Sequence, residues 1–153
     1  MRFFPLFVSL EGAAVTVVGG GRVAARRIAV LLDFGCNVTV VSPACLPALE
    51  ELAASGRIRW IRRGYQPGDC AGARITLIAA DDPEVNRLAA EEARRAGALV
   101  NRADAPEDCD FYFPGIVTRG DAVVGVTSSG RDHRLARRLR EQIETAIGPE
   151  DTL

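Results

Sequence analysis

Apolar residues recur along this chain with two alternating periods. Short runs of β-branched and apolar residues predict strands, and most are followed by apolar residues at helical spacing. The predicted strands are 15–18, 38–41, 58–61, 75–80 and one that begins at 99, and the predicted helices are 23–34, 46–54 and 83–96. Alternation with short connections predicts an α/β fold, in which a parallel sheet carries helices on both faces.

The pattern changes near Asp104. Two predicted strands, 111–117 and 122–127, flank a turn that favours a hairpin, and a final helix follows. Apolar residues mark this helix at four-residue spacing: Leu135, Leu139, Ile143 and Ile147. We therefore expect a sheet domain over 1–110 and a β-plus-helix segment over 111–153. Because that segment is too small to bury a core alone, it needs the first domain or a partner subunit.

The turn after the first predicted strand is rich in glycine. Gly19, Gly20 and Gly21 separate strand from helix, and Ala24 takes the third small position of G-x-G-x-x-G/A. In this fingerprint Gly19 makes the tight turn, Gly21 lets the backbone approach a pyrophosphate, and Ala24 lets helix and strand pack closely. The helix N-terminus offers N–H groups to the phosphates. The sequence thus predicts a Rossmann-type dinucleotide site; the alternative is a purely structural turn.

Composition narrows the function classes. A net charge of −1 gives no reason to expect a nucleic-acid or membrane-surface partner. All 19 basic residues are arginine, so a Schiff-base lysine is excluded. Widely spaced cysteines, and a lone histidine, His133, predict no metal site. No run has transmembrane length, and the apolar start, 3–8, reads as an edge strand or docking segment rather than a signal peptide, which leaves the cytoplasm as the default compartment.

Candidate ligand-binding residues follow the predicted strands, whose carboxyl ends form one rim of the sheet. Ser42 stands where an acidic residue would grip the ribose of NAD, so the residues alone do not favour NAD over NADP; Ser42-Pro43 also reads as a plain strand terminator. Asp81-Asp82 either caps the next helix or contacts the cofactor. Asp104 lies beyond a strand end and could accept a proton, its alternative being an Asx-turn before Pro106.

An arginine-rich run opens the last helix. Its members are Arg131, Arg134, Arg137, Arg138 and Arg140. A solvated helix face is one interpretation, and an anion site that pairs guanidinium groups with substrate carboxylates is the other.

Taken together, these residues resemble the precorrin-2 dehydrogenase family, which comprises the N-terminal module of bacterial siroheme synthase and its stand-alone relatives. The matching segments run in family order along almost the whole chain: Pro5-Leu6-Phe7, Val17 to Ala24, Val38 to Pro43, Ala79 to Asp82 with Val85-Asn86, Val100-Asn101 with Asp104, Phe111 with Pro114, and Leu135-Ala136-Arg137 with Leu139-Arg140.

The resemblance implies NAD-dependent oxidation of precorrin-2 to sirohydrochlorin by a homodimer that exchanges the segment after the nucleotide domain. It implies that Asp104 is catalytic and that the missing acid after the second strand is a family trait. The resemblance also implies cofactor contacts at Arg22-Val23 and Pro43-Ala44, and places Ser128 in the substrate region. Together with the fingerprint and the strand ends, this gives the expected cofactor contacts Gly19, Gly21, Arg22, Val23, Ser42, Pro43, Ala44, Ala80 and Asp81. The expected substrate contacts are Asn101, Phe111, Pro114, Ser128 and Arg137.

Two departures and two rival functions stand beside this hypothesis. Asp132-His133 replaces the family's usual Ser-Pro pair, and longer relatives continue beyond Leu153 into a helical domain. A non-catalytic NAD-binding regulatory module would usually carry an acid in place of Ser42, and a short-chain oxidoreductase would need a lysine. Some relatives also insert iron into sirohydrochlorin; from the few metal ligands here we expect weak chelation or none.

Overall fold

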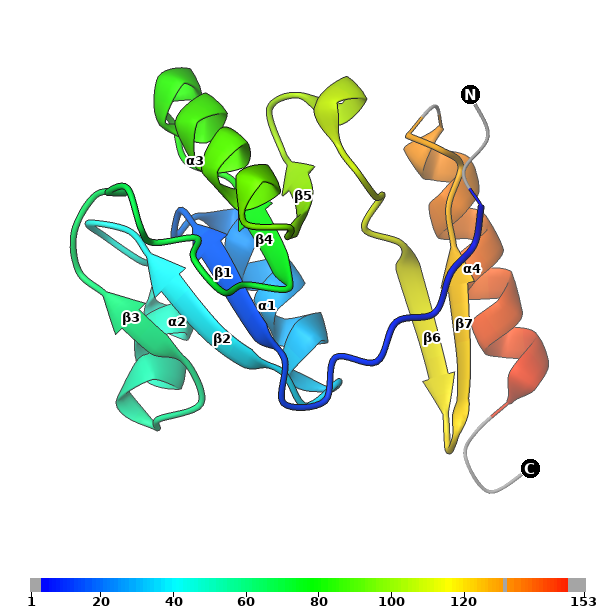
Figure 1. The fold of residues 1–153 in the computed structure, drawn as a ribbon. Helices are drawn as coiled ribbons and strands as arrows, with labels where there is room; N and C mark the ends of the chain where they lie inside the picture. The colour runs from blue at the N-terminus through cyan, green and yellow to red at the C-terminus, as the bar shows by residue number, and fades with distance from the viewer. Residues whose placement is uncertain (1–3, 131, 149–153) are drawn as a thin grey trace. The chain divides into compact units, whose positions relative to one another are not determined.

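The structure, a computed structural model, describes residues 4–130 and 132–148. The chain forms two compact units (Figure 1). One spans Val8–Phe111, and the other joins residues 4–7 to the chain from Tyr112 onward. The N-terminal segment, which the sequence assigns to the sheet domain, is thus grouped with the C-terminal segment; Phe3 lies outside the described residues.

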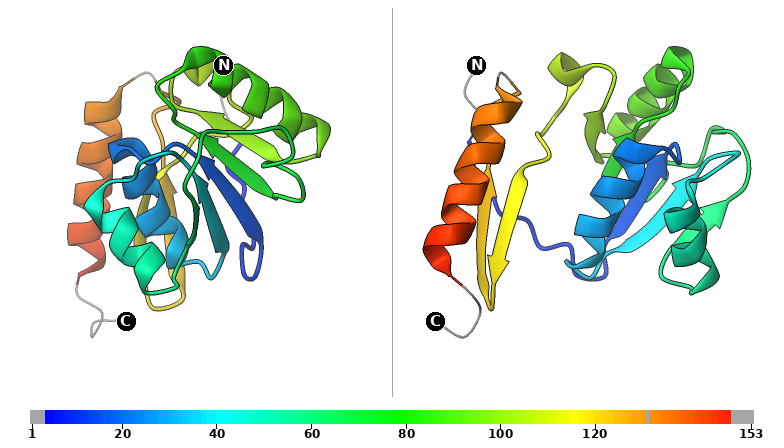
Figure 2. Two further views of the ribbon diagram at one scale, coloured as in Figure 1. Left: turned by 90° about the vertical axis from the view of Figure 1, so that its left-hand side faces the viewer. Right: turned by 180° about the vertical axis from the view of Figure 1, so that it is seen from behind.

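The first unit is a five-stranded, all-parallel sheet in the order β3-β2-β1-β4-β5. Its strands are β1 (Ala14–Val18), β2 (Asn37–Val41), β3 (Arg59–Ile61), β4 (Ile75–Ile78) and β5 (Leu99–Arg102). Its helices are α1 (Arg22–Leu32), α2 (Pro47–Ala54) and α3 (Pro83–Arg95). Figure 2 shows α1 and α2 on one face of the sheet and α3 on the other. The predicted α/β class is confirmed.

The core of this unit is the middle of the sheet. Val17, Val40 and Leu77, from three neighbouring strands, are at most 1% exposed. Such strands are covered on both faces, which explains why their sequences are runs of apolar residues and threonine rather than alternating apolar and charged residues. On α3 the buried side chains are small, namely Ala89, Ala90 and Ala93, together with the amide of Asn86, so this helix lies close against the sheet.

The connection from β3 to β4 contains no helix, and side chains hold it in place. Arg63 donates two hydrogen bonds of 2.7 Å to the Asp69 carboxylate within the loop. From α3, Glu92 accepts hydrogen bonds from the backbone N–H groups of Gly68 (3.0 Å) and Cys70 (2.8 Å), and from the Tyr65 hydroxyl. Burial and the neighbouring Glu92 carboxylate raise the pKa of Tyr65, so the phenol stays a donor.

The second unit contains the antiparallel pair β6 (Gly115–Arg119) and β7 (Ala122–Val126), followed by α4 (His133–Ile147). The hairpin is as predicted, but its first strand begins at 115 rather than 111. Residues 111–114 form the link from the first unit, in which Asn101 anchors the Phe111 carbonyl. Residues 4–7 adopt no strand, so the edge-strand prediction is wrong for them, and the docking-segment interpretation stays a prediction. The short helix η1 (Pro106–Asp108) precedes this link.

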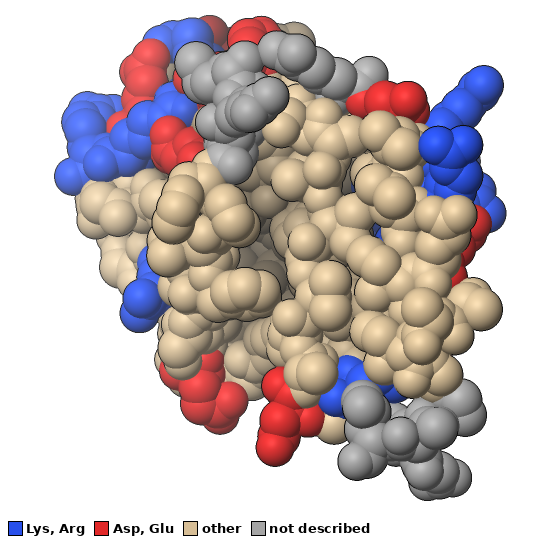
Figure 3. Space-filling view, turned by 90° about the vertical axis from the view of Figure 1, so that its right-hand side faces the viewer, with Lys and Arg blue, Asp and Glu red and all other residues tan. Residues whose placement is uncertain are grey.

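The second unit fully buries few of its apolar side chains. Among its described residues only Val117 and Val126 are buried, and α4 has no buried residue. The large exposed apolar residues of this unit are Phe4 (87%), Leu6 (73%), Phe7 (72%), Leu139 (38%) and Val123 (36%). Figure 3 shows a broad face with few charged side chains, which gather at its rim.

Among the described helices, none is both long and apolar enough to cross a membrane.

Candidate active site

The three glycines after β1 differ in why they are glycine. Gly19 has a φ of +108°, and a Cβ there would lie 2.3 Å from the carbonyl oxygen of Ala79. A Cβ on Gly20 would lie 2.4 Å from the carbonyl oxygen of Ala44. Gly21 has an ordinary φ of −83°, and a Cβ there would meet nothing within 4 Å. The fold itself demands the first two glycines, whereas the third keeps open the space beside the turn.

That space adjoins the N-terminus of α1. Gly21 is the N-cap, no side chain caps the helix, and its first turn has no acidic residue. Ala24, the third small residue of the fingerprint, is 1% exposed and packs into the interior. An uncapped helix N-terminus beside a side-chain-free position suits a diphosphate, because N–H groups and the helix dipole both favour an anion. The turn therefore fits a dinucleotide. Arg22 and Val23 supply the first backbone N–H groups of α1.

This turn lies at the switch point of the sheet. β1 pairs with β2 on one side and with β4 on the other, and the chain order reverses between them. Ala79 donates its N–H to the Val18 carbonyl oxygen at 2.8 Å, which holds the two strand ends together. In open α/β sheets, ligands bind outside the carboxyl ends of the strands at this point.

At the end of β2, Ser42 is committed to the local turn. Its side chain is buried, and its Oγ donates a 2.6 Å hydrogen bond to the Ala44 carbonyl oxygen, across Pro43. The Ser42 carbonyl oxygen accepts a 2.9 Å bond from Trp60 Nε1. These bonds fit the strand-terminator interpretation. The roles of Ser42, Pro43 and Ala44 as cofactor contacts stay predictions.

At the end of β4, the capping residue is Asp82. Its Oδ1 accepts hydrogen bonds from the N–H groups of Glu84 (2.8 Å) and Val85 (3.4 Å) at the start of α3. Asp81 is exposed and leaves the capping to its neighbour. Since the cap needs only one of the two carboxylates, a cofactor contact stays a prediction for Asp81.

Asn86 is a residue that the sequence analysis did not assign to the site. Its buried amide accepts from Ala80 N–H (3.1 Å) and donates to the Ala80 carbonyl oxygen (3.0 Å). The Ala80 N–H is thus already paired, whereas its carbonyl oxygen can still accept a second hydrogen bond. The sequence did carry one signal, because Asn86 shares a helix face with Ala89, Ala90 and Ala93, and a buried amide on such a face needs polar partners.

Asp104, the predicted proton acceptor, is paired with an arginine. Arg102 Nε and Nη2 donate to its two carboxylate oxygens at 3.2 and 2.9 Å. The bonds from Arg102, and then one involving Asn86, lower the pKa of Asp104. The side chain remains 31% exposed. Asp104 is therefore an oriented, ionised carboxylate at the rim, rather than the side chain of an isolated Asx-turn.

The predicted substrate residues divide between the two units. Asn101 is 3% exposed; its Nδ2 donates to the Phe111 carbonyl oxygen at 2.7 Å, and its Oδ1 is buried without a hydrogen-bond partner among the described residues. Phe111 is half-buried. Pro114, Ser128 and Arg137 belong to the second unit. As substrate contacts, all five remain predictions.

Asp132, which departs from the Ser-Pro pair expected from the resemblance, caps α4. Its Oδ1 accepts from the Leu135 N–H at 2.9 Å, and its own N–H donates to Ser128 Oγ at 3.2 Å. The departure from the family pattern thus has a structural role at the start of the helix.

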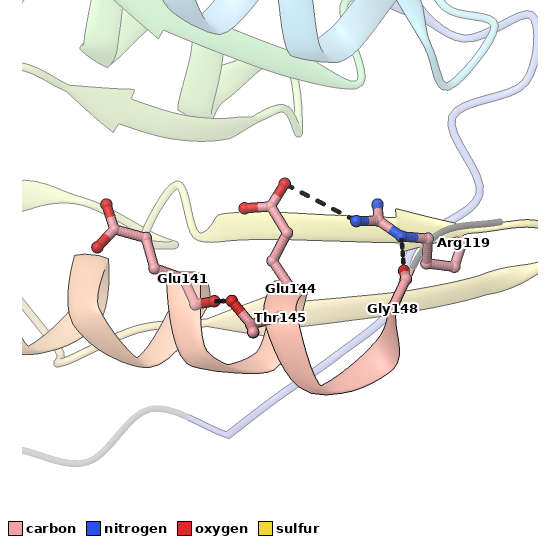
Figure 4. Close-up of a pocket in the computed structure, with 5 residues that line it drawn as sticks. All are labelled: Arg119, Glu141, Glu144, Thr145 and Gly148. Carbon is pink, nitrogen blue, oxygen red and sulfur yellow. Dashed lines mark hydrogen bonds and ion pairs between the residues drawn. The ribbon is translucent and has the colours of Figure 1, made fainter. Parts of the chain in front are cut away.

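The arginine-rich helix is partly neutralised along its own surface. Arg137 pairs with Glu141 at 2.8 Å and Arg140 with Glu144 at 2.6 Å, which fits the solvated-face interpretation for these two. Near the helix end lies a shallow pocket of about 480 Å³, lined by Arg119, Glu141, Glu144, Thr145 and Gly148 (Figure 4). Arg134 and Arg138 form no ion pair with any residue that the structure describes. Arg131 lies outside the described residues.

Most of the chain matches the model of a known protein family. Residues 6–115 match the family model described as "Putative NAD(P)-binding". The chain belongs to this family of NAD(P)-binding domains, which confirms the predicted class of cofactor.

Particular relatives then agree with the resemblance found in the sequence. The chain is 43% identical over 147 residues to the siroheme synthase of Methylobacillus flagellatus and 41% identical to that of Methylococcus capsulatus. It is covered to 96% in both matches but spans only about a third of each relative (32% and 31%). Among solved structures, SirC, a precorrin-2 dehydrogenase, superposes with a TM-score of 0.80 at 28% identity, over 94% of this chain and 71% of that one. The predicted similarity to the precorrin-2 dehydrogenase family is confirmed.

Proposed function

We propose that this chain is a cytoplasmic, NAD-dependent precorrin-2 dehydrogenase that forms sirohydrochlorin. The observation that carries the proposal is the rim of the sheet, where the dinucleotide turn after β1 and the carboxylate of Asp104 after β5 follow strands separated only by β4. At the spacing of parallel strands, β1 and β5 are about 10 Å apart. Precorrin-2 is proposed as the substrate because the chain is similar to siroheme synthases and to a precorrin-2 dehydrogenase.

The chemistry assigns separate tasks to the chain's residues. When bound, NAD would supply the hydride acceptor, and the chain's own residues would hold the cofactor and take up a proton. Gly21 and the N-terminus of α1 hold the diphosphate, which sets where the cofactor lies. Asp104, already ionised, accepts a proton that the tetrapyrrole loses with the hydride. Arg134 and Arg138, which form no ion pair among the described residues, suit the carboxylates of the substrate, because guanidinium groups pair with carboxylates in two parallel hydrogen bonds. Arg137 would contact the substrate by exchanging its ion pair with Glu141 for a substrate carboxylate.

The function is tested by incubating the purified chain with precorrin-2 and NAD in the absence of oxygen. We expect the absorption spectrum of sirohydrochlorin to appear with NADH, and neither to appear when NAD is omitted. Tight NAD binding without turnover of precorrin-2 would instead point to a regulatory NAD-binding module.

We also propose that the protein is a homodimer joined through the second unit. With Val117 and Val126 as its only buried apolar residues in the described part, this unit has too small a core to be stable alone. We expect the mass of a dimer in light scattering at micromolar concentration, and a monomer mass would contradict the proposal. Leu139→Glu should weaken the dimer, whereas Leu88→Glu, at a similarly exposed leucine of the first unit, should not.

For metal insertion we expect little or no activity. The sequence offers one histidine and dispersed cysteines, and the described residues include no group of three His, Cys, Asp or Glu side chains that could hold a metal ion. Incubation with sirohydrochlorin and ferrous or cobaltous ion should give rates close to the uncatalysed ones. Rates well above that background, lost in Asp104→Asn, would show that Asp104 serves both reactions and would contradict this expectation.

A further inference from the structure

A network of alternating aspartates and arginines extends from Asp104 within the first unit. Arg102 is its central member: besides its two bonds to Asp104, Arg102 Nη1 donates to Asp108 Oδ2 at 2.9 Å. Its side chain is only 12% exposed, so these interactions are shielded from solvent on most sides. A guanidinium held by two carboxylates has little freedom to turn, since its donors lie in one plane.

The end of this network remote from Asp104 is fixed to α3. Arg94 lies 3.0 Å from Asp108 Oδ1, and its Nη2 donates to the Asp108 carbonyl oxygen at 2.6 Å. Arg94 Nε also donates to Asp110 at 3.4 Å, and Asp110 accepts from the Val100 N–H of β5 at 2.9 Å. The connection after β5 is therefore secured at both ends, and the orientation of Arg102 is set by groups remote from the rim.

We propose that Arg102 is a positioning residue, which holds the Asp104 carboxylate in one orientation and in its ionised form for proton transfer. This inference rests on the proposed function, because it assigns how the proton acceptor of that reaction is prepared. The groups that face Asp104 are the guanidinium of Arg102, from β5, and the amide of Asn86, from α3; Asp108 of η1 shares Arg102 from behind.

A base must be deprotonated before it can accept a proton, and it must also be basic enough to accept one. The Arg102–Asp104 pair favours the first requirement and opposes the second. Two parallel N–H···O bonds fix the carboxylate plane and keep it deprotonated at neutral pH, as the lowered pKa of Asp104 indicates. The same bonds weaken its basicity. Without Arg102, the partly shielded carboxyl would take up a proton at higher pH and would rotate more freely, so the enzyme would lose activity earlier on acidification.

The test uses three variants and two readouts. Arg102→Gln removes the charge, Arg102→Lys keeps the charge but loses the paired geometry, and Arg87→Gln removes a control arginine that pairs with Glu84 and Glu91 on the exposed side of α3. The first readout is the titration midpoint of the Asp104 carboxyl in the cofactor-free protein, followed by carbon-13 NMR and assigned by its loss in Asp104→Asn. The second is the pH dependence of kcat for precorrin-2 oxidation.

We expect Arg102→Gln to raise the carboxyl midpoint by about one unit or more, the usual effect of losing a neighbouring guanidinium, and to move the acid limb of the kcat profile in the same direction. Arg102→Lys should give a smaller shift of both, and it carries the test if Arg102→Gln does not fold. Arg87→Gln should move neither.

An unchanged carboxyl midpoint in a folded Arg102 variant would overturn the inference. So would a shifted midpoint with an unmoved acid limb in an enzyme that turns over precorrin-2. If the wild-type chain does not oxidise precorrin-2 at all while the midpoint still shifts, the proposed function fails and the coupling of Arg102 to Asp104 stands.

Discussion

Replacing Gly21 with leucine should weaken NAD binding on the order of 100-fold or more, which corresponds to roughly 3 kcal/mol, and leave the free energy of unfolding nearly unchanged. The structure explains why the two quantities separate. A Cβ at Gly21 meets nothing within 4 Å and the φ there is ordinary, so the folded protein accommodates a side chain. That side chain would occupy the space beside the N-terminus of α1, where the diphosphate is expected.

Two other glycines serve as controls. Gly64→Leu adds the same side chain at an exposed position, again with nothing within 4 Å, and should change neither NAD affinity nor stability. Gly19→Ala should destabilise the fold, because its Cβ would lie 2.3 Å from the Ala79 carbonyl oxygen at a φ of +108°. Calorimetric titration with NAD and thermal unfolding measure both effects. Unchanged NAD affinity in Gly21→Leu would show that the cofactor site lies elsewhere.

Replacing Asp104 with asparagine should lower turnover on the order of 100-fold or more, the usual contribution of a general base, with NAD affinity and folding close to those of the parent. The amide keeps the shape of the carboxylate but has no useful basicity. Folding should persist because Arg102 retains its bond to Asp108. Since the pKa of Asp104 lies below its ordinary value, the wild-type enzyme should keep this base ionised at neutral pH and lose activity only as the pH falls toward that lowered pKa.

Asp81→Asn is the matched control, because it makes the same chemical change at another strand end. Asp81 is exposed and does not cap α3, so its replacement should affect turnover less and cofactor affinity more. Steady-state kinetics with precorrin-2, together with NAD titrations, separate the two variants. Near-normal turnover in Asp104→Asn combined with a large loss in Asp81→Asn would reverse the roles given to these two strand ends.

The order of strands and helices could be predicted because each is marked by local pattern. Runs such as 75–78 are buried throughout because both faces of the sheet are covered, and they consist of apolar and β-branched residues. Gly19 marks the turn because the turn requires a positive φ, which glycine adopts readily. The predicted continuation of that strand to Ala80 was wrong, because the Asn86 amide takes both backbone groups of Ala80 in place of a neighbouring strand.

The hydrogen-bond and ion-pair partners of individual polar side chains could not be predicted in the same way. Nothing local in the sequence indicates that Arg102 pairs with Asp104 rather than facing solvent, or that Arg94 of α3 fixes Asp108. The choice between Asp81 and Asp82 as helix cap likewise depends on backbone geometry. From the sequence alone, either aspartate could be the cap. The sequence therefore predicts which residues reach the rim, and the structure adds how they are held there.

The most direct test of the proposed dehydrogenase activity is the stoichiometry of one reaction, carried out without oxygen with the purified chain, precorrin-2 and NAD. NADH and sirohydrochlorin are followed together, in the wild type and in Asp104→Asn. We expect one NADH for each sirohydrochlorin formed by the wild type, no product without NAD, and a rate on the order of 100-fold lower in the variant. Absence of sirohydrochlorin from a folded chain that binds NAD, or equal rates in the two proteins, would contradict this expectation.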